Sequence, residues 1–156
     1  MIDLHSHLLP GVDDGSRSVE QSVGVLEVFK LRGVHTVAAT PHLTASQGGA
    51  GFPAAYEAAW RALEPAVPAG IRVVRGAEVM LDRPLPPVIA KDRLITLNRT
   101  RYILVEFPRV VPSEIVARAM ADIASQGLVP VLAHPERYSS CSVEAAEAWR
   151  DAGAVL

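Results

Sequence analysis

The 156-residue sequence has a single cysteine, few aromatic residues and no strong excess of charge of either sign. One cysteine, Cys141, excludes an internal disulfide and fits the reducing cytoplasm, where we expect the protein to act. No apolar run approaches the ~20 residues that span a bilayer, and no signal peptide precedes MIDLH, so we expect no direct membrane insertion. The formal net charge of -2 and the scattered arginines provide no basic surface for nucleic acid.

Brief apolar runs recur along the chain and alternate with amphipathic segments. The runs are rich in Val, Ile and Leu, as expected of strands that are buried on both faces, and they read MIDL, VHTVAA, IRVVRGAEV, YILVEF, LVPVLA and, last, AVL. Between them, apolar residues at helical spacing predict helices over 18–32, 53–66, 112–126 and 142–152. This alternation favours one α/β domain over residues 1–156, with parallel strands in an open sheet or a barrel.

Three local features refine this assignment. Ser18 and Gln21 have the spacing of a capping box at the start of the first helix, and Gly33 is a plausible stop. The proline-containing region 80–101 is less regular, with a short strand predicted at 94–96. The glycine-rich stretch 44–53 predicts a mobile loop.

Every expected strand before the last carries an imidazole or a carboxylate at its carboxyl end. In chain order these are His5 and His7, His42, Glu78, Glu106 and His134. The carboxyl ends of neighbouring parallel strands meet at one edge of a sheet, so we expect these side chains to converge. The first two histidines are separated by one residue and therefore point to the same face of their strand.

A structural interpretation exists for each of these residues taken singly. An isolated histidine more often makes a structural hydrogen bond, and His35, near the start of its strand, is interpreted in that way. A purely structural role explains Glu78 and Glu106 less well, because a carboxylate within an apolar strand is costly to bury unpaired. Nitrogen and oxygen donors without thiolate suit Mn, Fe, Zn or Mg, and so many donors imply more than one ion. Paired metal ions are typical of phosphate-ester hydrolysis.

The order of these motifs resembles a known family. HSH followed by DDGS resembles the first motif of the polymerase and histidinol phosphatase (PHP) superfamily, and ATPH, GAE and AHPERY resemble its later motifs. The forms GVDDGS, GAEVMLD, YILVEF and PVLAHPERY are most similar to the bacterial manganese-dependent protein-tyrosine phosphatases of capsule and exopolysaccharide synthesis. The resemblance runs over essentially the whole chain.

This resemblance implies a distorted (β/α)7 TIM-like barrel with two or three Mn²⁺ ions. By motif match, the metal ligands are His5, His7, Asp14, His42, Glu78, Glu106 and His134. Asp14 is assigned because the family ligand is the aspartate directly before the glycine. Asp13 is the alternative, or else a residue that forms the turn or caps a helix.

Arg137 is the phosphate-binding group that the resemblance implies. Independently of the family, a guanidinium three residues beyond a metal ligand can bind two phosphoryl oxygens and neutralise their charge. The alternative is a salt bridge with Glu136 or another carboxylate.

Two departures from the family pattern affect these expectations. Leu43 follows ATPH, where many members of this branch have a histidine or a basic residue. The Asp-x-His motif that closes the family site is missing before Leu156, and fewer strands are visible than a barrel needs. We therefore expect the catalytic domain to be incomplete at its carboxyl end, without its last strands and two ligands.

The leading functional hypothesis is a metal-dependent phosphomonoesterase that acts on phosphotyrosine, with a metal-activated hydroxide attacking phosphorus. The resemblance implies that the substrate is the phosphotyrosine tail of a bacterial tyrosine autokinase. The alternatives are a histidinol-phosphatase-like or other small-molecule phosphoesterase, and an inactive metal-binding or partner-binding module if the chain ends at Leu156. A homo-oligomer is a further alternative to a monomer. A cysteine-dependent phosphatase is excluded, because the position six residues after Cys141 is Glu147 and not arginine.

Overall fold

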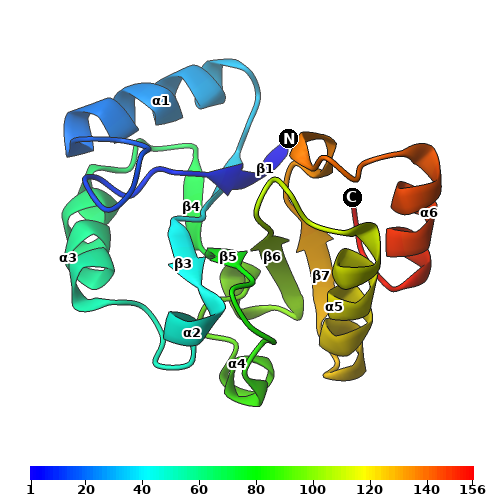
Figure 1. Ribbon diagram of the computed structural model, residues 1–156. Coiled ribbons are helices and arrows are strands. Elements are labelled where there is room, and N and C mark those ends of the chain that lie inside the picture. Colours follow the sequence, from blue (N-terminus) through cyan, green and yellow to red (C-terminus); the bar gives the residue numbers. More distant parts are fainter.

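A computed structural model describes the whole chain, residues 1–156, as parallel strands surrounded by helices (Figure 1). The strands are β1 (Ile2–Ser6), β2 (Thr36–Ala39), β3 (His42–Thr44), β4 (Arg72–Arg75), β5 (Glu78–Met80), β6 (Tyr102–Glu106) and β7 (Val129–Leu132). They form one sheet in the order β1-β2-β4 and another in the order β3-β5-β6-β7, and every pairing is parallel. The α/β class predicted from the alternating pattern is confirmed.

The helices are α1 (Val19–Leu31), α2 (Ala45–Gly48), α3 (Ala54–Leu63), α4 (Pro87–Asp92), α5 (Ser113–Ser125) and α6 (Val143–Asp151), with short 3-10 segments at Glu64–Ala66, Leu97–Arg99 and Pro135–Arg137. All four predicted helices are present within a few residues of their expected bounds. Ser18 caps α1 by accepting a hydrogen bond from the Gln21 N–H, and Gly33 follows the helix with a φ of +77°. No helix has both the length and the apolar character needed to cross a membrane.

One predicted strand is interrupted, and another is followed after a short break by a strand that was not predicted. The expected strand over 71–79 is divided into β4 and β5 at Gly76 and Ala77, and β3 begins directly after Thr40 and Pro41. Proline has no N–H to donate to a strand ladder. A β-carbon at Gly76 would collide with the Leu97 side chain, so glycine permits this close approach. The two interruptions are neighbours, because β2 pairs with β4 and β3 pairs with β5.

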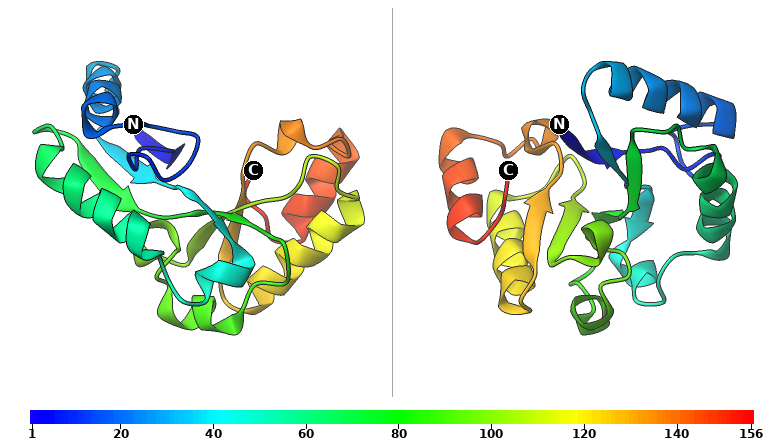
Figure 2. Two further views of the ribbon diagram at one scale, coloured as in Figure 1. Left: turned by 60° about the vertical axis from the view of Figure 1, so that its left-hand side comes forward. Right: turned by 180° about the vertical axis from the view of Figure 1, so that it is seen from behind.

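The strands do not close into a barrel. β1 pairs with β2 alone, and on the far side of β7 there is one isolated bridge, between Val131 and Val155. The expected last strand AVL is therefore reduced to that bridge. Closure requires hydrogen bonds that join the two edge strands, and residues 1–156 supply none. Figure 2 shows β1 with α1 and β7 with α5 and α6 as the two ends of this open arrangement.

Two expectations for irregular regions are wrong. Residues 94–96 form no strand, and the Thr96 hydroxyl instead donates hydrogen bonds to the carbonyls of Arg93 and Thr100 around the second 3-10 segment. The glycine-rich stretch 44–53 is not simply a loop, because it contains the end of β3 and the helix α2. Gly48 is buried there, and a β-carbon would collide with Ile95. Glycine thus serves close packing at this position.

Two apolar cores hold the helices against the strands. The larger one joins the β3-β5-β6-β7 sheet to α5 and α6, with Trp149 and Met120 fully buried. The smaller one joins the other sheet to α1 and α3 through Leu26 and Leu63. Both cores lie on the outer, helix-covered side of the strands, so the polar side chains described next occupy the opposite side.

Candidate metal centre

The seven predicted metal ligands are gathered in one place. Their donor atoms form three overlapping groups, in each of which all donors lie within 4.8 Å of one another. The groups are His5–Glu78–His134, His42–Glu78–Glu106 and His7–Asp14–His42. Glu78 and His42 each belong to two groups, so the site is one connected cluster of nitrogen and oxygen donors. The sequence-based expectation that these side chains converge agrees with this geometry.

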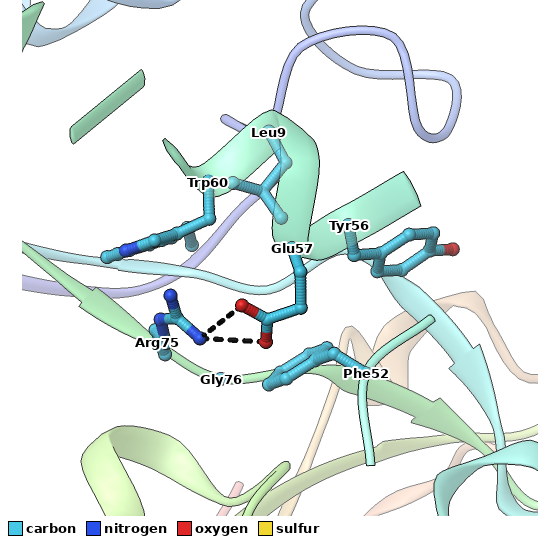
Figure 3. A pocket seen from close by; sticks show the side chains of 8 residues that line it. Leu9, Phe52, Tyr56, Glu57, Trp60, Arg75 and Gly76 are labelled. Carbon is cyan, nitrogen blue, oxygen red and sulfur yellow. Dashed lines mark hydrogen bonds and ion pairs between the residues drawn. The ribbon is translucent and has the colours of Figure 1, made fainter. Parts of the chain in front are cut away.

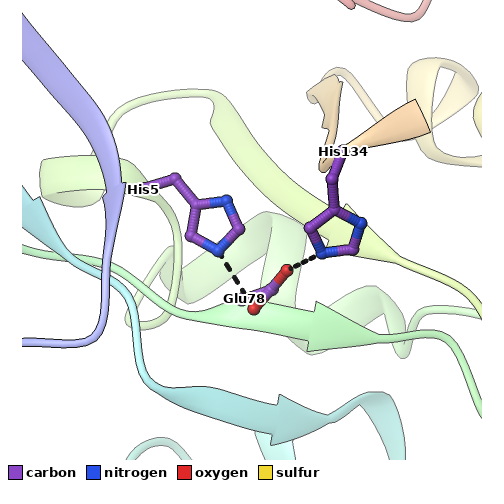
Figure 4. A group of neighbouring side chains, drawn as sticks. All are labelled: His5, Glu78 and His134. Carbon is purple, nitrogen blue, oxygen red and sulfur yellow. Dashed lines mark hydrogen bonds and ion pairs between the residues drawn. The ribbon is translucent and has the colours of Figure 1, made fainter. Parts of the chain in front are cut away.

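Glu78 lies at the centre of the cluster and is completely buried. Its Oε1 is 2.7 Å from Nε2 of His134, and Oε2 is 3.1 Å from Nε2 of His5 (Figure 4). The same Oε2 is 3.2 Å from ring nitrogens of both His7 and His42. Burial alone would raise the pKa of Glu78, but the imidazoles of His5 and His7 hold this pKa well below its usual range. Glu78 is therefore a buried carboxylate anion surrounded by imidazoles.

Not every buried donor atom of the cluster has a hydrogen-bond partner. Although Glu78 Oε2 lies within ion-pair distance of three imidazoles, it accepts no hydrogen bond of suitable geometry. The Nε2 atoms of His5 and His7 lie 3.2 Å apart and face each other. Buried acceptors without donors are rare in folded proteins, and a cation would satisfy them.

Strand register explains why Glu78 and His42 meet. The β3–β5 pairing places His42 directly opposite Glu78, and the β5–β6 pairing places Met80 opposite Glu106. The sequence interpretation placed His42 and Glu78 at the carboxyl ends of strands. Instead, each is the first residue of a strand segment that follows an interruption. The correction has a physical cause, since the breaks at Pro41 and Gly76 occur before these residues.

Asp13 and Asp14 have different surroundings. Asp14 is exposed and its Oδ1 lies 3.5 Å from His42 Nε2, whereas Asp13 accepts a 2.8 Å hydrogen bond from His7 Nδ1. That bond, with a further contribution from Glu78, raises the pKa of His7 to about 10. The Asp13 carboxylate also accepts hydrogen bonds from the N–H groups of Gly15 and His42. Burial would raise the pKa of Asp13, but the bond from His7, helped by these two N–H groups, lowers it. Asp13 thus orients His7 from behind, as carboxylates commonly do for metal-binding histidines.

Glu106 completes the buried part of the cluster. Its Oε1 lies 2.9 Å from Nδ1 of His42, and its Oε2 lies 3.6 Å from Nε2 of His134. Burial, together with the neighbouring Glu78 carboxylate, raises the pKa of Glu106 despite the favourable charge of His42. A divalent cation would offset this repulsion between two buried carboxylates.

His134 is held in a strained conformation. Its φ of 33° and ψ of 56° are left-handed, and its carbonyl accepts a 2.9 Å hydrogen bond from the Arg137 N–H. Such backbone conformations cost about 1–3 kcal/mol and are concentrated at functional sites. The Tyr138 hydroxyl stabilises the turn by donating to the Ala133 carbonyl at 3.0 Å and accepting from the Phe107 N–H at 3.2 Å.

Arg137 lines the opening of the cluster. It borders both an inner cavity of about 380 Å³, lined entirely by polar residues and glycine, and an outer cleft of about 630 Å³. Its guanidinium forms no ion pair, either with Glu136 or with any other carboxylate. The salt-bridge alternative is therefore wrong, and the cation is available to an anionic ligand. His35 lies outside the cluster, where its Nδ1 is 3.2 Å from the Thr36 hydroxyl.

Sequence reasoning missed the support that α3 gives to the site. The Tyr56 hydroxyl donates a 2.7 Å hydrogen bond to the carbonyl of His42. On the same helix, Glu57 accepts two hydrogen bonds of 2.8 and 3.0 Å from Arg75, whose guanidinium lies 4.6 Å from the Trp60 ring (Figure 3). These contacts join α3 to the end of β4. No local pattern indicates them, because they connect residues far apart in the sequence.

A second arginine was also missed. Arg109 lines the outer cleft, three residues after Glu106, in the same relation that Arg137 bears to His134. This shared spacing was present in the sequence and could have identified it.

Comparisons with known proteins agree with this geometry. Tyrosine-protein phosphatase YwqE of Bacillus subtilis is 33% identical over 141 residues, which cover 88% of this chain and 55% of the relative. Tyrosine-protein phosphatase CpsB of Streptococcus pneumoniae is 31% identical over 142 residues, covering 90% of this chain and 58% of the relative. The chain thus spans little more than half the length of these curated relatives.

Solved structures and a family model extend the comparison. A crystal structure reported for YwqE of Bacillus subtilis and CpsB of Streptococcus pneumoniae, described as unique metal-dependent tyrosine phosphatases, superposes with a TM-score of 0.74 at 30% identity. The match covers 99% of this chain and 64% of that one. The model of the family described as "Capsular polysaccharide synthesis, CpsB/CapC" matches residues 1–156. With its motifs, its fold and its cluster of donors in agreement, the chain belongs to the CpsB/CapC family of capsular polysaccharide synthesis.

Proposed function

We propose that the full-length protein is a metal-dependent phosphatase that hydrolyses phosphotyrosine in proteins. The observation that carries this proposal is the connected cluster of nitrogen and oxygen donors, with an unpaired arginine at its opening. The names of the relatives support it, since YwqE and CpsB are both named tyrosine-protein phosphatases.

The residues that hold the metal ions in this proposal are His5, His7, Asp14, His42, Glu78, Glu106 and His134. Their donors suit two or three Mn²⁺ ions, and Fe, Zn and Mg have compatible ligand preferences. When bound, such ions activate a water molecule and stabilise negative charge on the phosphoryl oxygens. Asp13 keeps His7 oriented, and Tyr56 keeps the backbone at His42 in place.

The two compartments of the site match the two parts of phosphotyrosine. The inner cavity has no apolar side chain and is suited to the phosphoryl group, with Arg137 binding its oxygens. The outer cleft adds Met80, Phe107 and Pro108, which offer an apolar wall to the tyrosine ring. No covalent intermediate on the protein is required, and the single thiol, Cys141, lies outside both compartments.

We further propose that the natural protein continues into a distorted (β/α)7 barrel. Support comes from the greater length of the relatives and from the open edges at β1 and β7. Additional strands would close the sheet and add the Asp-x-His ligands of the PHP pattern. The catalytic domain would then begin in residues 1–156 and be completed by later residues.

The proposed partner is a bacterial tyrosine autokinase of capsule or exopolysaccharide synthesis. The family description and the names of the relatives support this assignment. A cytoplasmic location suits the proposal, because an exposed free thiol such as Cys141 stays reduced there.

The direct test is phosphate release from a phosphotyrosine peptide by the full-length protein with added Mn²⁺. Activity should appear with the metal and vanish on chelation. His7→Ala and Glu106→Ala should abolish turnover, whereas His35→Ala, which removes a histidine outside the cluster, should leave it largely intact. Equal loss at His35 would contradict the division between ligand and structural histidines.

Two further measurements separate this proposal from its alternatives. Arg137→Ala should impair turnover and leave the metal content unchanged; loss of metal would contradict its role in phosphate binding. Faster hydrolysis of histidinol phosphate than of the phosphotyrosine peptide would favour a small-molecule phosphoesterase. Fewer than two bound ions per chain, with no hydrolysis of either substrate, would indicate an inactive binding module.

A further inference from the structure

Two arginines line the cleft that borders Asp14, His42, Glu106 and His134 of the cluster, and both lack a carboxylate partner. Arg109 and Arg137 border the same cleft of about 630 Å³, and neither forms an ion pair. Glu136 is the one acidic lining residue that is neither a candidate ligand nor part of an ion pair. Two unpaired cations in one cleft repel each other, and an anion bound between them would relieve this repulsion.

The positions of the two arginines differ in one respect. Arg137 also borders the inner polar cavity that contains His5, Glu78 and His134, whereas Arg109 borders the outer cleft alone. A phosphoryl group at the cluster is therefore adjacent to Arg137. Arg109 lines the larger cleft but not the inner cavity, so it can contact a part of the substrate next to the phosphoryl group.

The loop that carries Arg109 is anchored to the turn that carries Arg137. The Arg109 carbonyl accepts a 2.9 Å hydrogen bond from the Ser139 N–H. The Tyr138 hydroxyl accepts a hydrogen bond from the Phe107 N–H, so the same turn is tied to the residue after β6. The backbone at Arg109 is thus preorganised relative to Arg137, and less entropy is lost when both guanidinium groups bind one ligand.

We propose that Arg109 is a specificity-determining residue that binds a carboxylate beside the phosphotyrosine, so that the enzyme prefers phosphotyrosine peptides with flanking acidic residues. This proposal rests on the proposed phosphatase function. A guanidinium donates paired hydrogen bonds to a carboxylate. The side chain is exposed, and an exposed ion pair of this kind changes affinity by about fivefold.

The test uses two phosphotyrosine peptides that differ only in the flanking residues, which are Glu in one and Gln in the other. We expect the full-length wild-type protein to favour the Glu peptide about fivefold in kcat/KM, mainly through KM. Arg109→Ala should remove this preference, and Arg109→Glu should reverse it. Arg101→Ala is the matched control, because Arg101 is an exposed arginine at the opposite end of β6 and should keep the wild-type ratio. Added salt should weaken the preference in the wild type and have no effect on it in Arg109→Ala.

Two results would overturn the proposal. An unchanged preference in Arg109→Ala would exclude a contact with the flanking residue. An equal loss of kcat/KM for both peptides would assign Arg109 to the phosphoryl group or to folding.

Fluorescence anisotropy with labelled versions of both peptides measures the same ratio without turnover. Absence of hydrolysis for either peptide would refute the phosphatase function. In that case the binding affinities decide the role of Arg109 alone. An affinity for the Glu peptide about fivefold higher than for the Gln peptide in the wild type, and lost in Arg109→Ala, supports the role. Equal or absent binding of the two peptides by the wild type refutes it.

Discussion

Replacing Glu78 by glutamine keeps the volume of the side chain and removes the negative charge at the centre of the cluster. Glu78 belongs to two of the three donor groups. We therefore expect Glu78→Gln to weaken the binding of two metal ions and to leave unchanged the binding of a third, at His7, Asp14 and His42. Four-ligand zinc sites contribute about 10–16 kcal/mol, or about 3 kcal/mol per ligand. Loss of one ligand therefore raises the dissociation constant of each affected ion by roughly a hundredfold.

The effect on stability can be estimated from the same figures. An ion present at 100 times its dissociation constant stabilises the folded state by about 2.7 kcal/mol, and a hundredfold weaker ion by about 0.4 kcal/mol. Weaker binding of the two affected ions thus lowers the metal-dependent stabilisation of the folded state by about 5 kcal/mol in total. For a chain of this size, each kcal/mol shifts Tm by about 2–4 °C, so about 10–20 °C of the metal-induced rise in Tm should disappear.

The assay is thermal unfolding of the full-length protein at several Mn²⁺ concentrations, with metal content measured by mass spectrometry. His134→Ala and Asp14→Ala, which each affect one group, should lose about half as much of the metal-induced rise as Glu78→Gln. Glu136→Gln is the control, because Glu136 lines the cleft but belongs to no donor group. Wild-type metal content and an undiminished shift in Glu78→Gln would refute the idea that this carboxylate is shared between ions.

Three further predictions concern residues around the ligands. Asp13→Asn should weaken metal binding about 10- to 100-fold, because the hydrogen bond to His7 is altered, but the number of ions bound at saturation should stay the same. Asp14→Asn should reduce the number of ions bound at saturation. An equal number of bound ions in the two variants would contradict this division of roles. Gly15→Ala should impair metal binding as measured by calorimetry, because a β-carbon would collide with the backbone and β-carbon of His7; a wild-type titration would show that the turn can adjust. Tyr138→Phe should lower the free energy of unfolding by about 1–3 kcal/mol in chemical denaturation, since a buried N–H and a buried carbonyl lose their partner, while metal content stays unchanged.

Much of the fold was predictable because it depends on local patterns. The helices α1, α3, α5 and α6 follow from apolar spacing and capping residues that lie within one segment, as the Ser18 cap illustrates. The interruption before Glu78 was not predicted, because apolar composition continues through it, and the short strand β3 that begins at His42 was not predicted either. They depend on Pro41 and on the contact between Gly76 and Leu97, which a linear pattern does not reveal.

The candidate site shows the same division. The identities of its imidazoles and carboxylates, and their positions near strand segments, were evident from the sequence alone, because buried charge in apolar runs is exceptional. Which donors lie within reach of one another was decided in part by strand register, which sets His42 opposite Glu78. The separate roles of Asp13 and Asp14 and the opening of Arg109 into the cleft also depend on tertiary structure. The reason is physical: residue type is written in the chain, whereas the distance between donor atoms on different strands exists only once those strands have paired and packed.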